Sequence, residues 1–418
     1  MKLSMRNVAK IESADLELKG ITVIAGNNNT GKSTVGKTVY SLFNSMVNIN
    51  SKIRDQKASL IAKFFDQKLF EDPNDRYDWL QRGLPSPLHW AQRISGYSQY
   101  SEIRAFLTDV LGERYDESFI DSLINDILEI NNLPEDRLVK SAISVYFRRI
   151  FYGEIGNIYQ ENANTVIDAQ IAGKTIHLKF KENVCTDLVR QIDITNEAVY
   201  LDNPFVLDKL NTSLSGLNDI QRNVIRKLLH TMEAVDNVVQ QDYISEKLKP
   251  VMSQLNKVSA GIVEIGEARS YYYKDSVKGK KLNLSNLSAG LKSFVIIKML
   301  LENGTLKERD VLILDEPEIH LHPEWQLIYA ELIVLLQKAF DLTIVLTTHS
   351  QHFLEALQFF SEKYGRTDYC TYYLSQQSER GCVIQDVSSD IRQIYSQMVD
   401  PSILLDKMRC QMEEDTDE

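Results

Sequence analysis

The sequence predicts an α/β fold, with a core built around a largely parallel sheet and two helical insertions. Short apolar strands alternate with helical segments, as in parallel sheets covered by helices. The strands that end in polar residues lie far apart in the 418-residue chain. The long stretches between them carry apolar residues at helical spacing, so we expect these stretches to project from one core.

Composition places the chain among ordinary globular proteins, with 43% hydrophobic and 25% charged residues. No apolar run reaches the roughly 18 residues that span a bilayer, and the N-terminus lacks the apolar centre of a signal peptide. Four scattered cysteines without a CxxC pair favour a reduced cytoplasmic protein without structural zinc. A net charge of −11 offers no global basic field for nucleic acid, although a local basic patch stays open.

The first half of the chain reads as strands, then helices, then strands. Residues 2–25 predict three short strands, and helical spacing begins at Thr30. Residues 51–159 form the first helical insertion, broken by DPND and GLPSP. A hairpin turning near Ala172-Gly173 follows, and EAVYLDNPFVLD contains another strand.

The second half predicts a helical subdomain and then the rest of the core. Residues 215–270 are expected to be helical, with an interruption at Pro250 and with one apolar face before it made by Leu217, Ile220, Val224, Leu228, Met232 and Val235. Beyond Ser276 we expect a helix starting in NLSAGLKSF, the strand DVLILDE, a helix from about Pro323, the strand LTIVLTT and a last α/β segment. The predicted core is therefore 1–50, 160–207 and 275–418, and the second insertion is 208–274.

A phosphate-binding loop follows the third strand. GNNNTGKST places Gly26, Gly31, Lys32 and Ser33 in the G-x-x-x-x-G-K-[ST] pattern, between a strand and a helix. The backbone N–H groups and the helix N-terminus would cradle phosphates, Lys32 would reach the β- and γ-phosphates, and the Ser33 hydroxyl would ligate Mg²⁺. The predicted nucleotide-binding residues are Gly26, Asn27, Asn28, Asn29, Thr30, Gly31, Lys32, Ser33 and Thr34.

Two later strands end in residues suited to phosphate chemistry. VLILDEPEIHLHPEWQ ends an apolar strand in Asp315 and Glu316, at the edge where parallel sheets present ligands. Asp315 is predicted to hold Mg²⁺ and Glu316 to polarise an attacking water. TIVLTTHS ends the next strand near His349, which could hydrogen-bond the γ-phosphate and the water. Glu316, His349 and Lys32 are the predicted catalytic residues.

Several other patterns have plainer interpretations. His320 and His322 form an H-x-H pair, but a role in positioning their loop or meeting a neighbouring subunit is favoured over metal binding. DLELK, from Asp15, has the spacing of a D-x-E-x-K nuclease cluster, but its place on an alternating strand favours solvated carboxylates. KDSVKGKK is the best basic segment, and we interpret it as a solvated hairpin turn.

A second anion-binding helix start lies far downstream, in NLSAGLKSF. The Ser288 hydroxyl, the Gly290 N–H and a helix dipole would together bind an anion, with Ala289 between them. Since the site around Lys32 is expected to enclose the near side of the γ-phosphate, a second anion site would be redundant within one subunit. It is expected to serve the nucleotide of a partner subunit.

The ordered set GNNNTGKS, LSAGLKS, LILDEPEIHLHP and TTHS resembles the head domain of ABC-type ATPases. LSAGLKS is similar to the signature of the SMC and DNA-repair branch, although Ala289 replaces the first signature glycine and Leu291 a polar residue. DEPEIHLHPEWQ is similar to prokaryotic AAA-family ATPases related to the OLD (overcoming lysogenisation defect) family, including the Septu and PARIS anti-phage systems. The resemblance covers roughly residues 1–45, 195–207 and 275–360.

This resemblance implies a phosphate-loop ATPase head with a mixed sheet core, which uses ATP and Mg²⁺ and converts ATP and water to ADP and phosphate. It implies a homodimer, or a higher even-numbered homo-oligomer, that meets head to tail around ATP and turns over slowly alone. Fewer than 70 residues follow His349, so we expect the nuclease or toxin effector to be a separate protein. The alternative is a chromosome-maintenance or DNA-repair ATPase that binds DNA. A transporter subunit is disfavoured, because HLHP and the large insertions do not fit one. Asp202 and Asn203 stand about where a coupling glutamine is usual.

Overall fold

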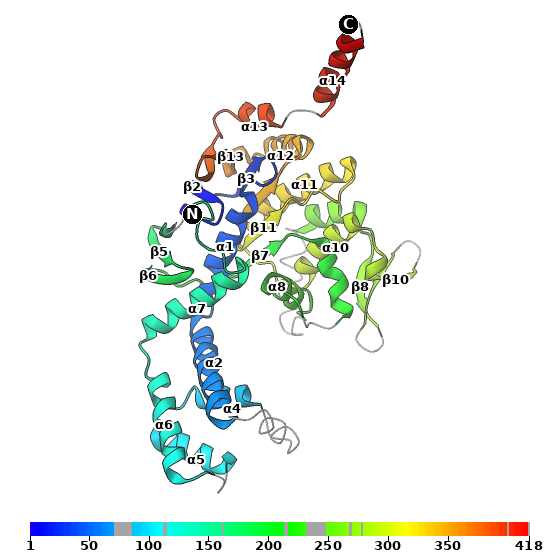
Figure 1. The fold of residues 1–418 in the computed structure, drawn as a ribbon. Helices are drawn as coiled ribbons and strands as arrows, with labels where there is room; N and C mark the ends of the chain where they lie inside the picture. The colour runs from blue at the N-terminus through cyan, green and yellow to red at the C-terminus, as the bar shows by residue number, and fades with distance from the viewer. Residues whose placement is uncertain are drawn as a thin grey trace.

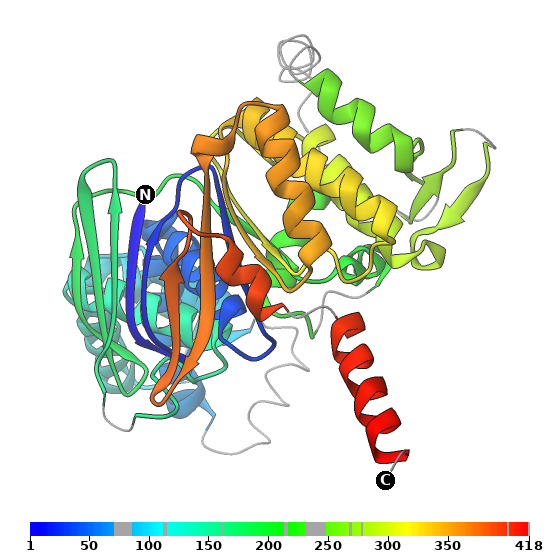
Figure 2. The same cartoon turned by 90° about the horizontal axis from the view of Figure 1, so that it is seen from above.

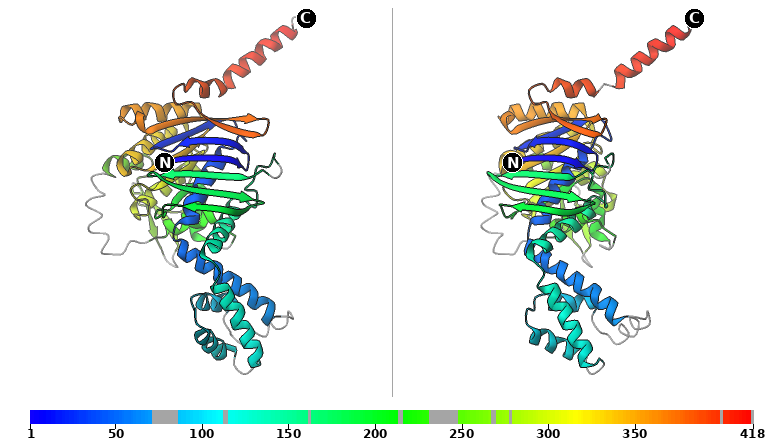
Figure 3. Two further views of the ribbon diagram at one scale, coloured as in Figure 1. Left: turned by 90° about the vertical axis from the view of Figure 1, so that its left-hand side faces the viewer. Right: turned by 60° about the vertical axis from the view of Figure 1, so that its left-hand side comes forward.

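The computed structural model describes residues 1–70, 86–111, 115–160, 163–212, 216–230, 248–266, 270–276, 279–398 and 401–416. One large sheet and its covering helices form the body of the molecule (Figure 1). A block of helices projects from one end of this body, and the C-terminal helix projects from the other end (Figure 3).

The large sheet has eleven strands in the order β6-β5-β4-β1-β2-β14-β13-β3-β12-β11-β7. The strands are β1 (Lys2–Val8), β2 (Ile11–Glu17), β3 (Ile21–Gly26), β4 (Thr165–Ile171), β5 (Lys174–Lys181), β6 (Val184–Arg190), β7 (Ala198–Leu201), β11 (Val311–Asp315), β12 (Thr343–Thr348), β13 (Cys370–Ser378) and β14 (Gly381–Asp386). Strands β13, β3, β12, β11 and β7 run parallel, whereas β6 to β2 are antiparallel neighbours. The sheet is therefore mixed, and the expectation of a largely parallel sheet holds only for its β13-to-β7 part.

The predicted hairpin is confirmed, and a further strand extends it. Ala172 and Gly173, with φ of 50° and 79°, form the turn between β4 and β5. Strand β6 was not predicted, because its turn is made by Glu182 and Asn183, which adopt φ of 50° and 63° without the glycine that marks such turns. The antiparallel part of the sheet is consequently one strand wider than the sequence indicated.

Helices of the first insertion surround their own apolar core. The insertion and the helix before it comprise α1 (Lys32–Met46), α2 (Ile49–Leu69), α4 (Pro87–Ile94), α5 (Tyr100–Leu111), α6 (Glu117–Asn131) and α7 (Glu135–Ile150). Phe65, Trp90, Leu107 and Ile124 are buried together between these helices and apart from the sheet. Helix α7 returns to the sheet and packs with α1. The structure thus shows the expected helices, while the boundaries of the insertion as a domain stay a prediction.

The second insertion is only partly helical. Residues 204–286, which include the insertion and its flanks, contain η2 (Pro204–Asn211), α8 (Asp219–Leu228), helical residues 248–258, β8 (Ile262–Ile265), β9 (Tyr271–Lys274), β10 (Lys281–Asn283) and η4 (Leu284–Asn286). The prediction of helix up to residue 270 is wrong, because Ile262–Ile265 and the tyrosine-rich Tyr271–Lys274 pair as strands, and β-branched and aromatic residues favour strands. Pro250 is the third residue of the described helical stretch 248–258, and the residues just before this stretch, like Met232 and Val235, lie outside the described residues, so the interruption at Pro250 stays a prediction. Strands β9 and β10 pair antiparallel with Lys281 opposite Lys274, so the two ends of KDSVKGKK meet as expected for a hairpin.

Three helices, α10 (Ala289–Glu302), α11 (Pro323–Phe340) and α12 (Gln351–Lys363), cover the face of the sheet opposite α1 (Figure 2). The chain continues through η5 (Thr367–Tyr369) and α13 (Arg392–Gln397) to the projecting helix α14 (Pro401–Thr416). Along each parallel strand, alternate side chains point to opposite faces of the sheet. Ile313 packs in the cluster that contains α1, whereas Leu312 and Leu314 pack in the cluster that contains α10, α11 and α12. Both faces of β11 are therefore buried, and its polar end is left at the sheet edge.

Gly36 lets α1 lie directly on β7 and β11. A Cβ at Gly36 would lie 2.9 Å from Ile313 Cγ2 and 2.9 Å from Tyr200 Cε2. Gly36→Val should therefore overpack this contact and lower the unfolding free energy by about 1–3 kcal/mol in a urea titration. Gly96→Val is the matched control, because nothing lies within 4 Å of a Cβ at that position. Equal stabilities of the two variants would contradict this packing.

Candidate active site

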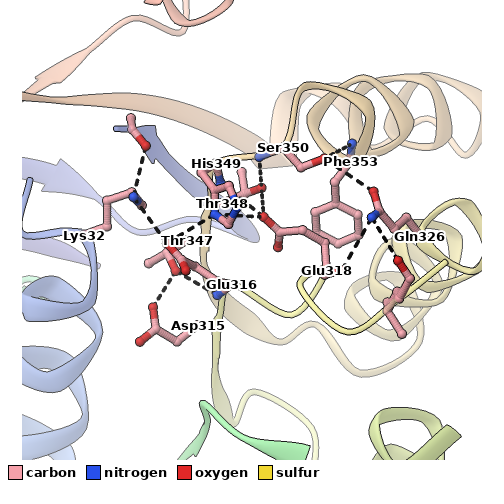
Figure 4. Close-up of polar contacts among 12 residues, drawn as sticks. Lys32, Asp315, Glu316, Glu318, Gln326, Thr347, Thr348, His349, Ser350 and Phe353 are labelled. Carbon is pink, nitrogen blue, oxygen red and sulfur yellow. Dashed lines mark hydrogen bonds and ion pairs between the residues drawn. The ribbon is translucent and has the colours of Figure 1, made fainter. Parts of the chain in front are cut away.

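The predicted site residues meet at one edge of the sheet, where three neighbouring parallel strands end. Strand β12 lies between β3 and β11, with Thr348 paired to Ala25 and Asp315 paired to Thr347. The loop after β3 therefore faces the acidic end of β11 across the end of β12. Figure 4 shows the polar contacts that join these segments.

The phosphate-binding loop has the backbone conformation that its glycines were expected to permit. Gly26 and Gly31 have φ of 146° and 86°, and a Cβ at Gly26 would lie 2.5 Å from the Ser375 carbonyl oxygen. The Thr30 hydroxyl donates to the Asn27 carbonyl at 2.8 Å. The Ser375 hydroxyl donates to the Thr30 carbonyl at 2.6 Å, so strand β13 supports the loop from one side.

Lys32 lies inside this loop and is 4% exposed. Its Nζ donates to the carbonyl oxygens of Gly26 at 3.0 Å and Asn27 at 2.9 Å. The same Nζ lies 3.3 Å from Glu316 Oε1. A buried ammonium group that is already aimed along the loop fits the binding of a phosphate chain.

The Asp315 carboxylate accepts hydrogen bonds from three hydroxyl groups. Ser33 donates to Oδ1 at 3.0 Å, Thr347 to Oδ1 at 2.5 Å, and Tyr200 to Oδ2 at 2.7 Å. Burial, and then the neighbouring Asp315 charge, raise the pKa of Tyr200 well above its usual range, so its hydroxyl stays a proton donor. Ser33 and Asp315 together offer a hydroxyl and a carboxylate oxygen, which are the ligand types that Mg²⁺ prefers, so these residues fit that ion.

Glu316 points away from Asp315 and toward Lys32 and His349. Its Oε1 lies 3.3 Å from Lys32 Nζ and 3.4 Å from His349 Nδ1. The residue adopts φ of 48°, an uncommon conformation for a non-glycine residue, and its N–H donates to the Thr347 hydroxyl at 3.0 Å. This backbone turn is what separates the directions of the two consecutive carboxylates.

Glu318 is a site residue that the sequence analysis missed. It is 2% exposed, accepts a hydrogen bond from the Thr348 hydroxyl, and accepts the His349 N–H at 3.1 Å. Burial raises the pKa of Glu318 above its ordinary value of 4.5, partly opposed by these two bonds. Its place two residues after Glu316 in DEPE is the only sequence signal for it. Tyr200 and Thr347 were also missed, because their contacts to Asp315 join separate strands.

Ser288 caps helix α10, and Gly290 is required by packing within the chain. The Ser288 hydroxyl accepts the Leu291 N–H at 3.3 Å, and the Ser288 side chain is exposed. A Cβ at Gly290 would lie 2.9 Å from the His320 carbonyl oxygen and 3.1 Å from Trp325. Lys292, which is 1% exposed, pairs with Asp208 of η2 at 2.7 Å. The helix start, with Ala289 inside it, is thus attached to η2 and to the loop after β11.

A small pocket of about 50 Å³ lies between the ends of β7 and β11 and helix α10. Asp202 and Asn203 line it together with Asp315, Glu316 and Ser293. The two residues that stand where a coupling glutamine was expected therefore adjoin the acidic strand end.

The remaining sequence patterns lie elsewhere. Asp15 accepts from Arg6 on the exposed face of β1 and β2, and this bond lowers the pKa of Asp15. His320 is exposed and meets the ring of Phe205 edge-on, with ring centroids 5.6 Å apart. His322 is exposed at the start of α11. Within the described parts of the chain, His, Cys, Asp and Glu side chains form no group of three or more suited to a metal ion.

Comparison with known proteins assigns the chain to a family. The sequence model of a family described as an AAA ATPase domain matches residues 1–354. The chain belongs to this family. Membership of an AAA ATPase family implies nucleotide binding, and the α/β class with a mixed sheet is confirmed. In the part of the AAA ATPase that the structure describes, no helix combines the length and apolarity needed to cross a membrane.

Two solved structures are similar to this AAA ATPase. The SMC head domain from Thermotoga maritima shares 13% identity over 92% of this chain and 98% of that chain, with a TM-score of 0.38. An SMC head bound to the C-terminal winged-helix domain of ScpA shares 11% identity over 94% of this chain and 98% of that chain, with a TM-score of 0.42. Neither likeness bears on function.

The role of Glu318 in holding His349 can be tested by stability. Glu318→Gln keeps an oxygen acceptor for the Thr348 hydroxyl and the His349 N–H. Glu318→Ala leaves both buried donors without that acceptor, so the unfolding free energy should fall by about 1–3 kcal/mol or more in urea.

Glu318→Gln should also change how the unfolding free energy depends on pH. Because the pKa of Glu318 is raised on folding, the folded chain binds more protons than the unfolded chain between the ordinary value of 4.5 and the higher folded pKa. The unfolding free energy therefore falls as pH rises through the folded pKa, and Glu318→Gln should remove this component. Urea titrations at a series of pH values measure it, with Glu324→Gln, at an exposed position, as control. An unchanged slope in Glu318→Gln would contradict a raised pKa.

Proposed function

We propose that this AAA ATPase hydrolyses ATP with Mg²⁺, dimerises head to tail around ATP, and controls a separate effector protein. The observation that carries the proposal is the position of Glu316. Its carboxylate lies between the buried ammonium of Lys32 and the His349 ring, within 3.4 Å of both. A general base placed between a phosphate-binding cation and a second proton-carrying group suits the activation of water for phosphoryl transfer.

Each residue then has one task in the reaction. Lys32 moves from the carbonyl oxygens of the loop to the β- and γ-phosphates of ATP and neutralises their charge. Ser33 and Asp315 would hold Mg²⁺, which when bound supplies further neutralisation of phosphate charge. Glu316 accepts a hydrogen bond from the attacking water and takes its proton. His349, held at its backbone N–H by Glu318, contacts the γ-phosphate and keeps Glu316 oriented.

The dimer part of the proposal is supported by the start of α10. Ser288 accepts the Leu291 N–H with one lone pair, which leaves its hydroxyl hydrogen available to an anion. The exposed Ser288 and the half-buried Ala289, at the positive end of a helix, suit a phosphate that approaches from outside the subunit. We assign these residues, with the Gly290 N–H, to the nucleotide bound by the partner subunit.

The effector part rests on the motif resemblance to anti-phage ATPases and on the shape of the chain. The helices around Phe65 and Trp90 have their own apolar core and project from the body, as a docking surface would (Figure 1). We propose that a cytoplasmic nuclease or toxin binds this block. Copurification followed by mass spectrometry tests this, and recovery of DNA instead would favour the chromosome-maintenance alternative.

Glu316→Gln separates nucleotide binding from hydrolysis. Loss of the base should lower turnover by about 10²–10⁴-fold, while ATP binding remains and the ATP-bound dimer accumulates. Lys32→Ala should instead abolish ATP binding. Phosphate release, equilibrium binding and light scattering measure these outcomes, with the exposed Glu362→Gln on α12 as control. Wild-type turnover by Glu316→Gln would contradict the assignment.

Mixing two inactive variants tests the shared site. Ser288→Asp keeps a side chain that caps helices but places a negative charge where the partner's phosphate would lie, and Ser288→Asn is the neutral capping control. A dimer of Ser288→Asp with Lys32→Ala contains one intact composite site, so an equal mixture should recover up to about a quarter of wild-type activity. No recovery on mixing, or full activity of Ser288→Asp alone, would contradict the shared-site model.

A further inference from the structure

Tyr200 of β7 contacts the proposed Mg²⁺ ligand Asp315 from inside the protein. The tyrosine is 1% exposed, and its hydroxyl donates to Asp315 Oδ2 at 2.7 Å. The other carboxylate oxygen, Oδ1, accepts from the Ser33 hydroxyl at 3.0 Å and from the Thr347 hydroxyl at 2.5 Å. The two oxygens of Asp315 therefore have different surroundings. Oδ2 faces a buried phenol, whereas Oδ1 faces the start of α1, where the phosphate loop ends.

The ring of Tyr200 has little room to move, because helix α1 lies directly on it. A Cβ at Gly36 would lie 2.9 Å from Tyr200 Cε2, and the ring of Tyr40 meets that of Tyr200 edge-on with centroids 5.9 Å apart. Farther along α1, the Asn44 amide donates to the Ala198 carbonyl at 2.8 Å and accepts the Ala198 N–H at 2.9 Å. Helix α1 and strand β7 are thereby held in one position relative to each other, and the Tyr200 hydroxyl with them.

These hydrogen bonds leave Asp315 one oxygen to offer a cation that Ser33 also holds. A carboxylate has about four acceptor sites, two on each oxygen. When the Ser33 oxygen ligates Mg²⁺, as proposed, its hydrogen turns away from Asp315 and frees one site on Oδ1. Tyr200 keeps its bond to Oδ2, so the carboxylate is prevented from rotating to direct both oxygens at the same ion. Asp315 is thus restricted to ligation through a single oxygen.

Ligation through a single carboxylate oxygen suits Mg²⁺ better than Ca²⁺. Mg²⁺ requires nearly octahedral geometry at about 2.0–2.1 Å, and it usually keeps several waters and takes few protein ligands. Ca²⁺ takes roughly six to eight oxygens at about 2.3–2.6 Å, and it accepts both oxygens of one carboxylate. An anchored carboxylate therefore removes a contact that only the larger ion could use.

We propose that Tyr200 selects Mg²⁺ over Ca²⁺ at the nucleotide site by anchoring Oδ2 of Asp315. Tyr200 is then a positioning residue, because its hydroxyl acts on the ion only through Asp315, and this role rests on the proposed ATPase function. Tyr200→Phe keeps the ring and removes the hydroxyl. Asp315 is then held less firmly for Mg²⁺ and can turn both oxygens toward Ca²⁺, so the preference for Mg²⁺ should fall.

Calorimetry of the full chain with a non-hydrolysable ATP analogue, in Mg²⁺ or in Ca²⁺, tests this selection. The wild type should bind the analogue more tightly with Mg²⁺. In Tyr200→Phe the ratio of the two affinities should fall about tenfold, as expected for the loss of one hydrogen bond to a charged group. Tyr373→Phe is the matched control and should leave the ratio unchanged. It also removes a buried hydroxyl, which accepts the Glu17 N–H at 2.7 Å, but on a strand that does not adjoin β11.

An unchanged ratio in Tyr200→Phe, or an equal fall in Tyr373→Phe, would overturn the role of Tyr200. A wild type that binds the analogue equally tightly with both ions would overturn it too, and this measurement needs no variant to fold. Failure of the ATPase proposal has a different signature. In that case neither ion supports binding of the analogue, or Lys32→Ala binds it as tightly as the wild type.

Discussion

The buried ammonium group of Lys32 is the constraint on which the site depends. A charge that is 4% exposed is costly unless neighbouring groups compensate it. Two carbonyl oxygens of the loop and the Glu316 carboxylate do so within 3.3 Å. The loop must therefore curl, which requires the positive φ of Gly26 and Gly31, and β11 must end beside it. The parallel order β3-β12-β11 satisfies both requirements, because it brings a loop and a carboxylate from distant parts of the chain to one edge.

The burial of β11 and β12 explains why polar side chains gather at this edge of the sheet. Both strands are apolar on their two faces, so polar side chains appear only where the strands end. There Thr347 contributes its hydroxyl twice, as a donor to Asp315 and as an acceptor of the Glu316 N–H. Thr347 thus holds the Asp315 carboxylate on the side of Ser33. Its hydrogen bond to the Glu316 N–H accompanies the turn that directs the Glu316 carboxylate toward Lys32 and His349. The separate roles proposed for Asp315 and Glu316 depend on this turn.

What the sequence could predict was local. The motif around Lys32, the apolar strand before Asp315 and the cap at Ser288 are each encoded within about ten residues, and the structure has the predicted elements there. Strand β6 and the β8–β10 sheet were missed, since one turn lacks glycine and short strands beside a helix give weak periodicity. Tyr200 and Glu318 were missed because they act through contacts between segments that are far apart in the sequence. Tyr200 contacts Asp315, and Glu318 contacts His349.

The start of α10 and the acidic strand end form one packed unit, which bears on how two subunits would communicate. Gly290 brings the backbone of α10 so close to the His320 carbonyl that a Cβ at this position would lie 2.9 Å from its oxygen. Lys292, almost fully buried, pairs with Asp208 and lies over the ring of Phe205, which in turn meets His320. Breaking a buried ion pair is costly, by about 3–5 kcal/mol when one partner is removed. A shift of η2, whose chain leads back to Asp202 beside Asp315, would therefore carry Ser288 with it. In the proposed dimer, this packing would link the nucleotide state of one site to the surface that the subunit offers to its partner.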